Sequence, residues 1–354
     1  MKEKFFLLTL AIMSMLSYGQ DNQLVWANGH LLYGTPIDSL TYDKMEDLEI
    51  IHILLPRIVE KTIHDTVTIV TYDTIETIIY DTIYVNKHVR KPEGALPGEF
   101  YVSPTKKISF AKGNLQYLAS AGVWRFAENQ YDFIGSKNNN ASKSYNGWID
   151  VFGYGTSGWS GSGASYYQPW NAHYSNDDLS GYLNHNLSGS YDNADWGVFN
   201  QISNGGNTTN MWRTLSQKEW EYLITNHDWT IVQVAGILGL MVLPDNFKNP
   251  LTISINYPSY RSGLHDSDKN YSLSFSSMTK LTIEQFEMLQ NAGVVFLPCG
   301  GYRYSIGMMD IDTFGNYWTS TAGKNIWFTQ AVLYCVSGAE RWAGLQVRLA
   351  TDIE

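Results

Sequence analysis

The sequence is poor in residue types that whole classes of protein require. Only 16% of its 354 residues are charged, and 24 Lys and Arg stand against 34 Asp and Glu. A formal net charge of −10 argues against broad binding to a phosphate backbone, which needs an excess of cationic side chains on one face. Hydrophobic residues still make up 44% of the chain, so it is not wholly disordered. We expect folded domains and no nucleic-acid partner.

Cysteine is the scarcest residue type, with only Cys299 and Cys335. Neither has a histidine at metal-ligand spacing, so the pair does not predict a zinc site. In an oxidising compartment the two could form one disulfide. Equally, each could be a small buried hydrophobic side chain, as cysteine often is. The sequence leaves both interpretations open.

Long apolar runs are also lacking, except near the N-terminus. Lys2 and Lys4 precede the apolar run 5–16, and the small residues Ser17 and Gly19 follow it. This layout is typical of a secretory signal peptide, here residues 1–19, and the run is too short to span a membrane. The alternative is a buried N-terminal helix. The signal-peptide interpretation predicts an exported protein at the cell surface or outside the cell, with no transmembrane helix in the mature chain.

Residues 20–95 differ in composition from the rest. Thr, Ile, Val and Tyr dominate residues 62–85, and these side chains fit a pleated strand. The sequence YDTI at 72–75 recurs at 80–83, with a looser copy at 64–67. An even period of eight keeps equivalent side chains on one face of a strand. We predict a β-rich N-terminal stalk, followed by a Pro- and Gly-rich linker that ends near 99.

The same segment contains four Asp-Ser/Thr-aliphatic triplets. They resemble the O-glycosylation sequon of Bacteroidota, and they predict glycans on Ser39, Thr66, Thr74 and Thr82. Glycans would solvate strand edges that could otherwise pair with other chains. The alternative is that the Asp-Thr pairs only punctuate a β-repeat.

Residues 99–354 mix short strands, long loops and two helix starts. Ser216 with Glu219 and Thr282 with Gln285 have capping-box spacing, and apolar residues follow each pair at intervals of three and four. Gly293 is placed to end the second helix. The polar stretch 136–210 has few strand or helix signals, but its tryptophans indicate a packed segment rather than a disordered one.

Several motifs then stand in order along the chain: GNLQY (113–117), WRTLSQKEWEYL (212–223), VFLPCGGYR (295–303), GNYWTST (315–321) and GLQVRLA (344–350). With them the sequence resembles secreted Bacteroidota proteins that carry a module like the Fibrobacter succinogenes major paralogous domain. That module belongs to the formylglycine-generating-enzyme-like branch of the C-type lectin fold. The resemblance covers 99–354. It implies an α+β fold with two helices, small antiparallel sheets and long loops.

The resemblance also implies a function, because this branch includes adhesins and receptors that bind ligands through the C-terminal segment. We therefore expect a non-catalytic recognition module for a glycan or protein ligand. Trp and Arg are common binding anchors. We expect Trp318 in the core and Arg348 in a structural role, and Lys324, Asn325 and Arg341 exposed. The candidate ligand-binding residues are Lys324, Asn325, Trp327, Thr329, Arg341 and Trp342.

Two other functions remain as alternatives. A strand-rich stalk could complete a neighbour's sheet, as in an assembly subunit of a surface appendage. A formylglycine-generating-type oxidase is a remote alternative, because such enzymes bind copper with two closely spaced cysteines and this sequence does not match that motif.

No cofactor is predicted, and calcium is an open question. Acidic residues gather in the loop region, and Ca²⁺ takes oxygen ligands, but their spacing matches no known calcium loop. Solvated loop acids are the alternative interpretation. The residues concerned are Asp177, Asp178, Asp192 and Asp195.

Overall fold

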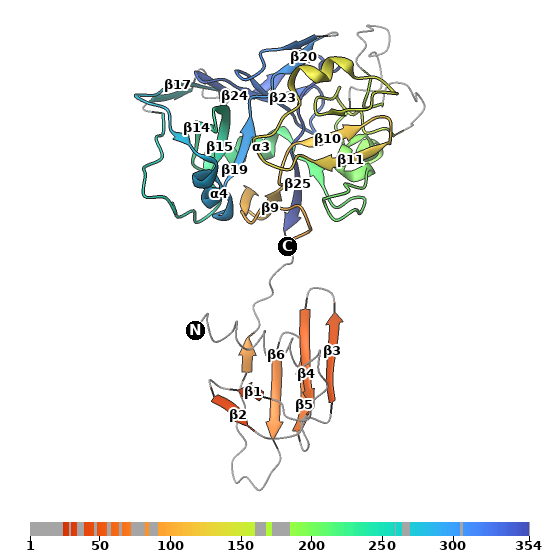
Figure 1. Ribbon diagram of the computed structural model, residues 1–354, viewed down its shortest axis with the longest axis vertical. Coiled ribbons are helices and arrows are strands. Elements are labelled where there is room, and N and C mark those ends of the chain that lie inside the picture. The colour runs from red at the N-terminus through yellow and green to blue at the C-terminus, as the bar shows by residue number, and fades with distance from the viewer. Residues whose placement is uncertain are drawn as a thin grey trace. The chain divides into compact units, whose positions relative to one another are not determined.

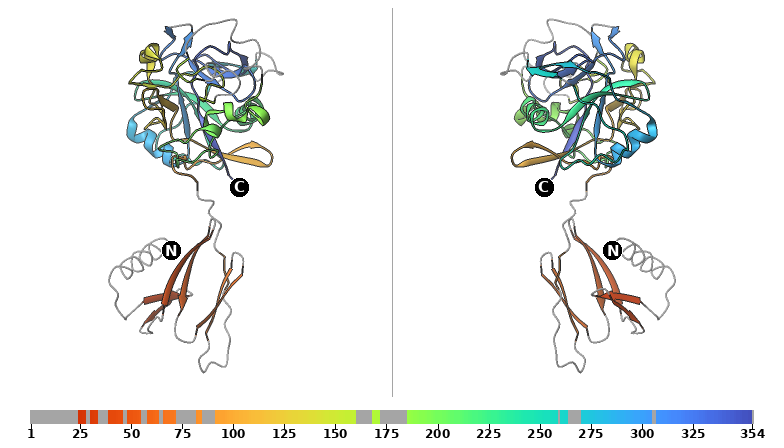
Figure 2. Two further views of the ribbon diagram at one scale, coloured as in Figure 1. Left: turned by 90° about the vertical axis from the view of Figure 1, so that its right-hand side faces the viewer. Right: turned by 90° about the vertical axis from the view of Figure 1, so that its left-hand side faces the viewer.

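The protein is an α+β chain of two compact units, divided between Arg90 and Lys91 (Figures 1 and 2). The computed structural model describes residues 91–159, 168–171, 185–258, 271–304 and 307–353, without the side chain of Val336. It also describes the backbone of the strands between 24 and 84, of 260–263 and of Asn270. The predicted signal peptide 1–19 lies outside the described residues.

The first unit contains short antiparallel strands in three separate sheets, with the orders β1-β2, β3-β4 and β5-β6-β7. β-Branched residues dominate β5 and β6, which pair from Ile58↔Thr71 to Ile63↔Thr66. The strands are β1 (Leu24–Ala27), β2 (His30–Tyr33), β3 (Ser39–Met45), β4 (Leu48–Leu54), β5 (Ile58–Ile63), β6 (Thr66–Thr71) and β7 (Thr82–Tyr84).

The eight-residue repeat does not form one continuous strand. The chain reverses between β6 and β7, so the copies at 64–67 and 80–83 reach different strands. Ser39, Thr66 and Thr82, three of the predicted glycosylation sites, are the first residues of β3, β6 and β7. Thr74 lies outside the described residues. Glycosylation of all four stays a prediction.

The Pro- and Gly-rich segment 92–98 packs into the second unit rather than forming an exposed linker. Leu96 is 3% exposed and belongs to a hydrophobic core cluster. Its backbone N–H donates to the carbonyl oxygen of Phe110, 2.8 Å away. A Cβ on Gly98 would collide with the carbonyl oxygen of Gly293. The glycines of this segment therefore allow close packing of the backbone. Composition alone does not distinguish this role from flexibility.

The second unit is built from five small sheets with the orders β13-β25-β9-β8, β11-β10-β12, β18-β14-β15-β19, β16-β17-β24-β23-β22 and β20-β21. Figure 1 shows them around the central helix α3. The first ten strands are β8 (Phe100–Ser103), β9 (Lys106–Phe110), β10 (Leu115–Leu118), β11 (Val123–Phe126), β12 (Trp148–Ile149), β13 (Arg213–Thr214), β14 (Trp229–Val234), β15 (Ile237–Val242), β16 (Tyr260–Gly263) and β17 (Asn270–Ser274). The others are β18 (Lys280–Leu281), β19 (Val295–Pro298), β20 (Tyr302–Tyr304), β21 (Gly307–Met309), β22 (Gly315–Trp318), β23 (Lys324–Phe328), β24 (Val332–Gly338) and β25 (Leu349–Ile353).

Both predicted helices are present and begin at their capping boxes. In α3 (Gln217–Asn226) the Ser216 side chain accepts from the Glu219 N–H, and the Glu219 carboxylate accepts from the Ser216 N–H. The second helix, α4 (Ile283–Asn291), has the same reciprocal pair with Thr282 and Gln285. Gly293 follows with a φ of +95°, a value that favours glycine. Shorter turns are η1 (Gly135–Asn140), η4 (Gly189–Ala194) and α2 (Trp196–Phe199).

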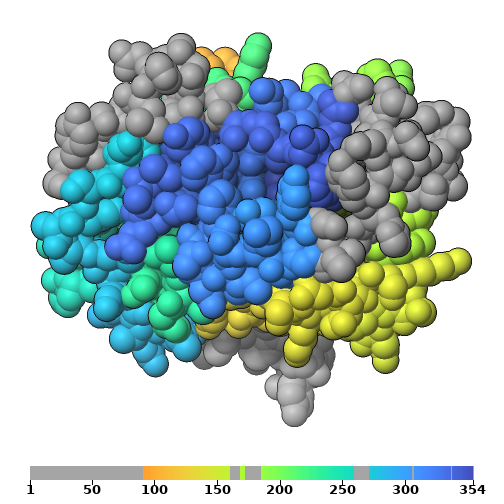
Figure 3. Space-filling model, turned by 90° about the horizontal axis from the view of Figure 1, so that it is seen from above, coloured from red at the N-terminus to blue at the C-terminus, as the bar shows by residue number. Residues whose placement is uncertain are grey.

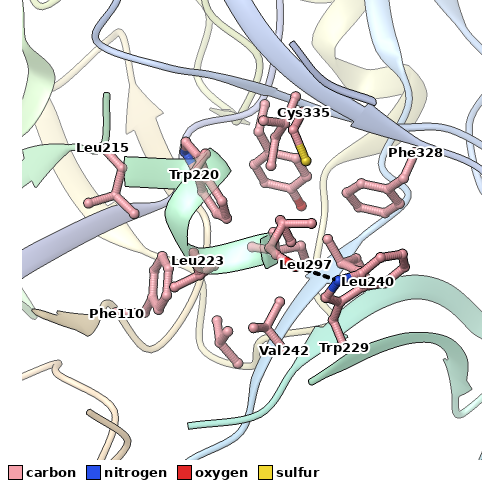
Figure 4. Close-up of a cluster of buried hydrophobic side chains, with 14 of the residues drawn as sticks. Phe110, Leu215, Trp220, Leu223, Trp229, Leu240, Val242, Leu297, Phe328 and Cys335 are labelled. Atoms are coloured by element: carbon pink, nitrogen blue, oxygen red, sulfur yellow. Dashed lines mark hydrogen bonds between the residues drawn. The ribbon is translucent and has the colours of Figure 1, made fainter. Parts of the chain in front are cut away.

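The largest core cluster lies between α3 and the sheets around it (Figure 4). Trp220 and Leu223 of α3 pack there with side chains of β14, β15 and β19, and the Trp229 indole N–H donates to the Ile224 carbonyl oxygen at 2.9 Å. The apolar residues 231–243 lie in the hairpin β14–β15, because the chain turns at Ala235 and Gly236.

A second core cluster accounts for tryptophans of the irregular region. Trp196 and Trp212 are 0% and 1% exposed, and Trp159 and Trp170 pack against the same cluster. Trp318 is 1% exposed and donates to the Phe152 carbonyl oxygen at 2.7 Å, so its predicted place in the core is confirmed. A third cluster joins α4 to the far side of β14, β15 and β19.

Arg348 is a structural residue, as predicted. It is 1% exposed, and its guanidinium donates to the side chain of Asn114 and to the carbonyl oxygens of Ala111, Gln130 and Phe296. These contacts tie four separate segments together. Among the described residues, none of the helices has the length and apolar character needed to cross a membrane.

Candidate functional site

A row of four aromatic rings lies on the side of β22–β24 that faces away from the largest core cluster. The ring centroids of Tyr302 and Phe314 are 5.4 Å apart, those of Phe314 and Trp327 5.0 Å, and those of Trp327 and Tyr334 4.1 Å. Strand alternation produces the row, because Phe328 and Leu333, beside Trp327 and Tyr334, belong to that core cluster. The four rings are half-buried, so part of each reaches solvent.

A second aromatic pair adjoins the row through β20. Tyr302 and Tyr304 are two residues apart on this strand and therefore project from the same face. The Tyr304 ring is 48% exposed and lies 4.3 Å from that of Trp342, which is 8% exposed. Met309, which pairs with Tyr302 across the hairpin, is 46% exposed.

We call these seven residues the aromatic face: Tyr302, Tyr304, Met309, Phe314, Trp327, Tyr334 and Trp342. Figure 3 looks onto the end of the second unit that carries β20, and the blue C-terminal segment fills the middle of the view. Exposed large apolar side chains that gather on one surface are typical of interaction sites.

The row leaves little open ring surface at its centre. The Trp327 ring lies at 17° to the Phe314 ring and at 10° to the Tyr334 ring, so both of its faces are covered. Its indole N–H donates to the Ser337 hydroxyl at 3.1 Å. Trp327 therefore offers no open ring face for stacking. Trp327 and its neighbours present ring edges and tyrosine hydroxyls to solvent.

Acidic residues stand beside the hairpin. Burial and the neighbouring Asp310 carboxylate raise the pKa of Tyr302, which keeps its hydroxyl protonated at physiological pH. Asp312 is exposed in the same turn, and Glu340 is exposed next to Arg341. The turn after the hairpin therefore carries negative charge, whereas Glu340 stands beside the cation Arg341.

Beneath the hairpin, Arg303 is 1% exposed, and desolvation lowers its pKa to about 10. Its Nη2 donates to the Asn171 carbonyl oxygen at 3.3 Å. Its Nε and Nη1 have no hydrogen-bond partner among the described residues.

Of the six predicted ligand-binding residues, the structure places two in the aromatic face: Trp327 and Trp342. The expectation that Asn325 is exposed is wrong. It is 2% exposed, and its amide donates to the Asn316 side chain at 2.7 Å across β22 and β23. Asn325 and Trp327 are two residues apart on β23 and therefore lie on the same side of the sheet, Asn325 beneath the surface and Trp327 at it.

The other three lie apart from the rings. Thr329 accepts a hydrogen bond from the Ala331 N–H at 3.1 Å and so closes the turn after β23. Lys324 and Arg341 are half-buried at the opposite end of that strand, where desolvation lowers the pKa of Arg341. Gly323 lies between them, and a Cβ there would be 3.4 Å from the Arg341 Nε. Lys324 and Arg341 are therefore placed to contact a ligand only at the rim of the aromatic face.

Sequence reasoning missed five members of the aromatic face: Tyr302, Tyr304, Met309, Phe314 and Tyr334. One local signal was available in β24, where Tyr334 stands between the core residues Leu333 and Cys335. A strand that is apolar on both faces either is buried on both or exposes one. The contact between Tyr302 and Phe314 depends on the fold of the hairpin, so no local sequence pattern predicts it.

The two cysteines do not form a disulfide. Both are buried thiols in the largest core cluster, and Figure 4 shows the Cys335 sulfur among its apolar side chains. Burial raises the pKa of the Cys299 thiol far above its ordinary value, so it is protonated and a poor nucleophile or metal ligand. The sequence left open a disulfide or two small buried hydrophobic side chains, and the structure shows the second arrangement.

Of the four acidic residues considered for calcium, the structure describes Asp192 and Asp195. Asp195 is 1% exposed and accepts from the backbone N–H groups of Gly197 and Thr214, so it caps α2. Asp192 is exposed, and Asp177 and Asp178 lie outside the described residues. Within the described residues, no group of three or more His, Cys, Asp or Glu side chains is arranged to hold a metal ion.

Comparison of the chain with protein-family models, with curated proteins and with solved structures finds no match.

Proposed function

We propose that this protein is a non-catalytic, exported binding protein, an adhesin or receptor-like module, that recognises its ligand through the C-terminal segment. The observation that carries the proposal is the aromatic face, which gathers tyrosine, tryptophan and methionine side chains from residues 302–342. The motifs of 99–354 support a C-type-lectin-like fold for this unit, and the signal-peptide layout supports export to the cell surface or exterior.

Between a glycan and a protein ligand, the geometry favours a protein. A sugar stacks on an open ring face, but the faces of Trp327 are covered by Phe314 and Tyr334. Tyr, Trp and Met are enriched at the centres of protein interfaces, where they bury area at low entropic cost. The exposed acids Asp310 and Asp312, in the turn after the β20–β21 hairpin, would suit a partner with a basic margin at that point.

The test uses the full chain against a protein array of surface and secreted proteins and, in parallel, a glycan array. The variant combines Tyr304→Ser with Met309→Ser. Its matched control combines Tyr101→Ser with Met288→Ser, whose parent side chains are 38% and 47% exposed on other elements. We expect saturable binding to a protein, weakened at least about tenfold by the first variant and within about twofold of wild type in the control.

Two results would count against the proposal. Binding that both double variants leave unchanged would place the ligand site away from the aromatic face. Binding to glycans alone, with sensitivity at Tyr304, would replace the protein ligand with a saccharide.

A second function, assembly into a surface appendage, is favoured by one observation. Within its described residues, the first unit contains two sheets of two strands each, β1-β2 and β3-β4, and such hairpins are marginally stable alone. Pairing of their edges with a neighbouring copy would stabilise them. Sedimentation should then show concentration-dependent oligomers that disappear when residues 20–95 are removed; a monomer at all concentrations excludes this role.

A further inference from the structure

The second unit has a cavity of about 610 Å³ that shares no residue with the aromatic face. It lies where the end of α3 meets the loop after β15 and the segment 254–257. Its volume falls within the range of small-molecule binding sites, about 300–1,000 Å³. The function proposed above does not use this cavity.

A largely buried histidine–aspartate contact fixes one wall. The His227 Nδ1 donates to the Leu223 carbonyl oxygen at 3.1 Å, and its Nε2 lies 2.9 Å from the Asp245 Oδ1. Both side chains are largely buried, at 4% and 17% exposed. The Asp245 backbone N–H donates to the Glu99 carbonyl oxygen at 2.9 Å, which fixes the position of this residue. The two ring nitrogens of His227 are thus both occupied, and the imidazole is not open to a ligand.

Three other polar side chains of the lining are open. Asp228, Asn246 and Ser254 are exposed, and among the described residues none of their side chains takes part in a hydrogen bond. Asn246 has a φ of +56°, which holds its loop in a left-handed turn at the cavity. A carboxylate, an amide and a hydroxyl therefore offer both acceptors and donors to a ligand.

Aromatic side chains supply an apolar part of the lining. Tyr257 is 39% exposed, and Phe247 is half-buried against the third core cluster. The lining contains no Lys or Arg, and the Lys107 ammonium, beside the lining residue Asp245, already pairs with Asp245 at 3.9 Å and with Glu99 at 3.3 Å. An anionic ligand would meet the Asp228 carboxylate without a cationic partner, which disfavours it.

We propose that this cavity binds a small neutral saccharide. Sugars combine an apolar ring face with hydroxyl groups that both donate and accept. The Asp228 carboxylate would accept from hydroxyls in charge-assisted hydrogen bonds, while Asn246 and Ser254 would serve neighbouring hydroxyls. The Tyr257 ring would cover the apolar face of the sugar.

The test is calorimetry and saturation-transfer NMR on the full chain with neutral probes: glucose, galactose, mannose, xylose, N-acetylglucosamine, maltose, cellobiose and lactose. Glucuronate and sialic acid serve as anionic counterparts. Asp228→Ala and Tyr257→Ala should each weaken binding of the neutral probe about tenfold, the effect of one lost charged hydrogen bond or ring contact. Because both parent side chains are exposed, the variants should fold, and circular dichroism checks this.

Asp192→Ala and Tyr101→Ala are the matched controls, since they remove exposed side chains of the same types outside the cavity. They should leave the affinity within about twofold of wild type. Three results would overturn the proposal: no neutral probe binding at 10 mM, preference for the anionic probes, or binding unchanged by both cavity variants. None of these results bears on the aromatic face, which the Tyr304→Ser/Met309→Ser variant tests separately.

Discussion

At the scale of single residues, Asp150 shows how burial can outweigh hydrogen bonding. Its carboxylate accepts from the Ile134 backbone N–H at 2.9 Å and from the Asn138 amide at 2.8 Å. Those bonds favour the charged form, yet desolvation raises the pKa of Asp150 to about 6. The folded chain therefore holds this proton to a higher pH than the unfolded chain does.

The sign of the resulting pH dependence follows directly. Between the ordinary pKa of 3.8 and the folded value of about 6, the folded state binds more protons, so its free energy of unfolding falls as pH rises and levels off above that window. We expect wild type to lose up to about 3 kcal/mol relative to Asp150→Asn between pH 4 and pH 7. Urea unfolding at each pH measures the difference. A flat difference curve contradicts the assignment.

At the scale of elements, the helix starts were predictable because their signals are local. The capping boxes of α3 and α4 lie within four residues of sequence, and both formed as expected. The aromatic face was not predictable in the same way. It requires Trp327 and Tyr334 from neighbouring strands and Phe314 from just before β22, brought together by antiparallel pairing and a register shift. Long-range pairing leaves no fixed spacing in the sequence.

The two capping boxes differ in their surroundings, so the cost of removing each capping hydroxyl can be compared. Glu219 of α3 also forms an ion pair with Arg213 at 2.7 Å, whereas Gln285 of α4 is neutral. Ser216→Ala should cost about 1–2 kcal/mol because it also loosens Glu219, and Thr282→Ala about 0.5–1 kcal/mol. Chemical denaturation compares the two variants. Equal costs would show that the Arg213 pair does not depend on the Ser216 cap.

At the scale of the whole molecule, composition and tertiary contacts assign the segment 92–98 differently. Pro92, Gly94, Pro97 and Gly98 have the composition of a linker, but Leu96 lies in the largest core cluster. The Lys112 N–H donates to the Gly94 carbonyl oxygen at 2.7 Å. Proline and glycine mark turns in packed and in exposed chain alike, so only tertiary contacts could fix the boundary at Arg90 and Lys91.

Two fragments test this boundary. The fragment 91–354 should fold as a cooperative unit, because it contains all three core clusters. The fragment 99–354 lacks Leu96 and the contact of that segment with Phe110, and it should be less stable by at least about 2 kcal/mol, the contribution of one buried leucine.

Leu96→Ala within 91–354 separates the side chain from the backbone contacts. It should cost about 2–5 kcal/mol, the range for a buried leucine truncated to alanine. If 99–354 is less stable than this variant, the hydrogen bonds to Phe110 and Lys112 contribute beyond the leucine side chain. If 99–354 is instead as stable as 91–354, residues 91–98 do not belong to the folded unit, and the boundary belongs near 99, where the composition placed it.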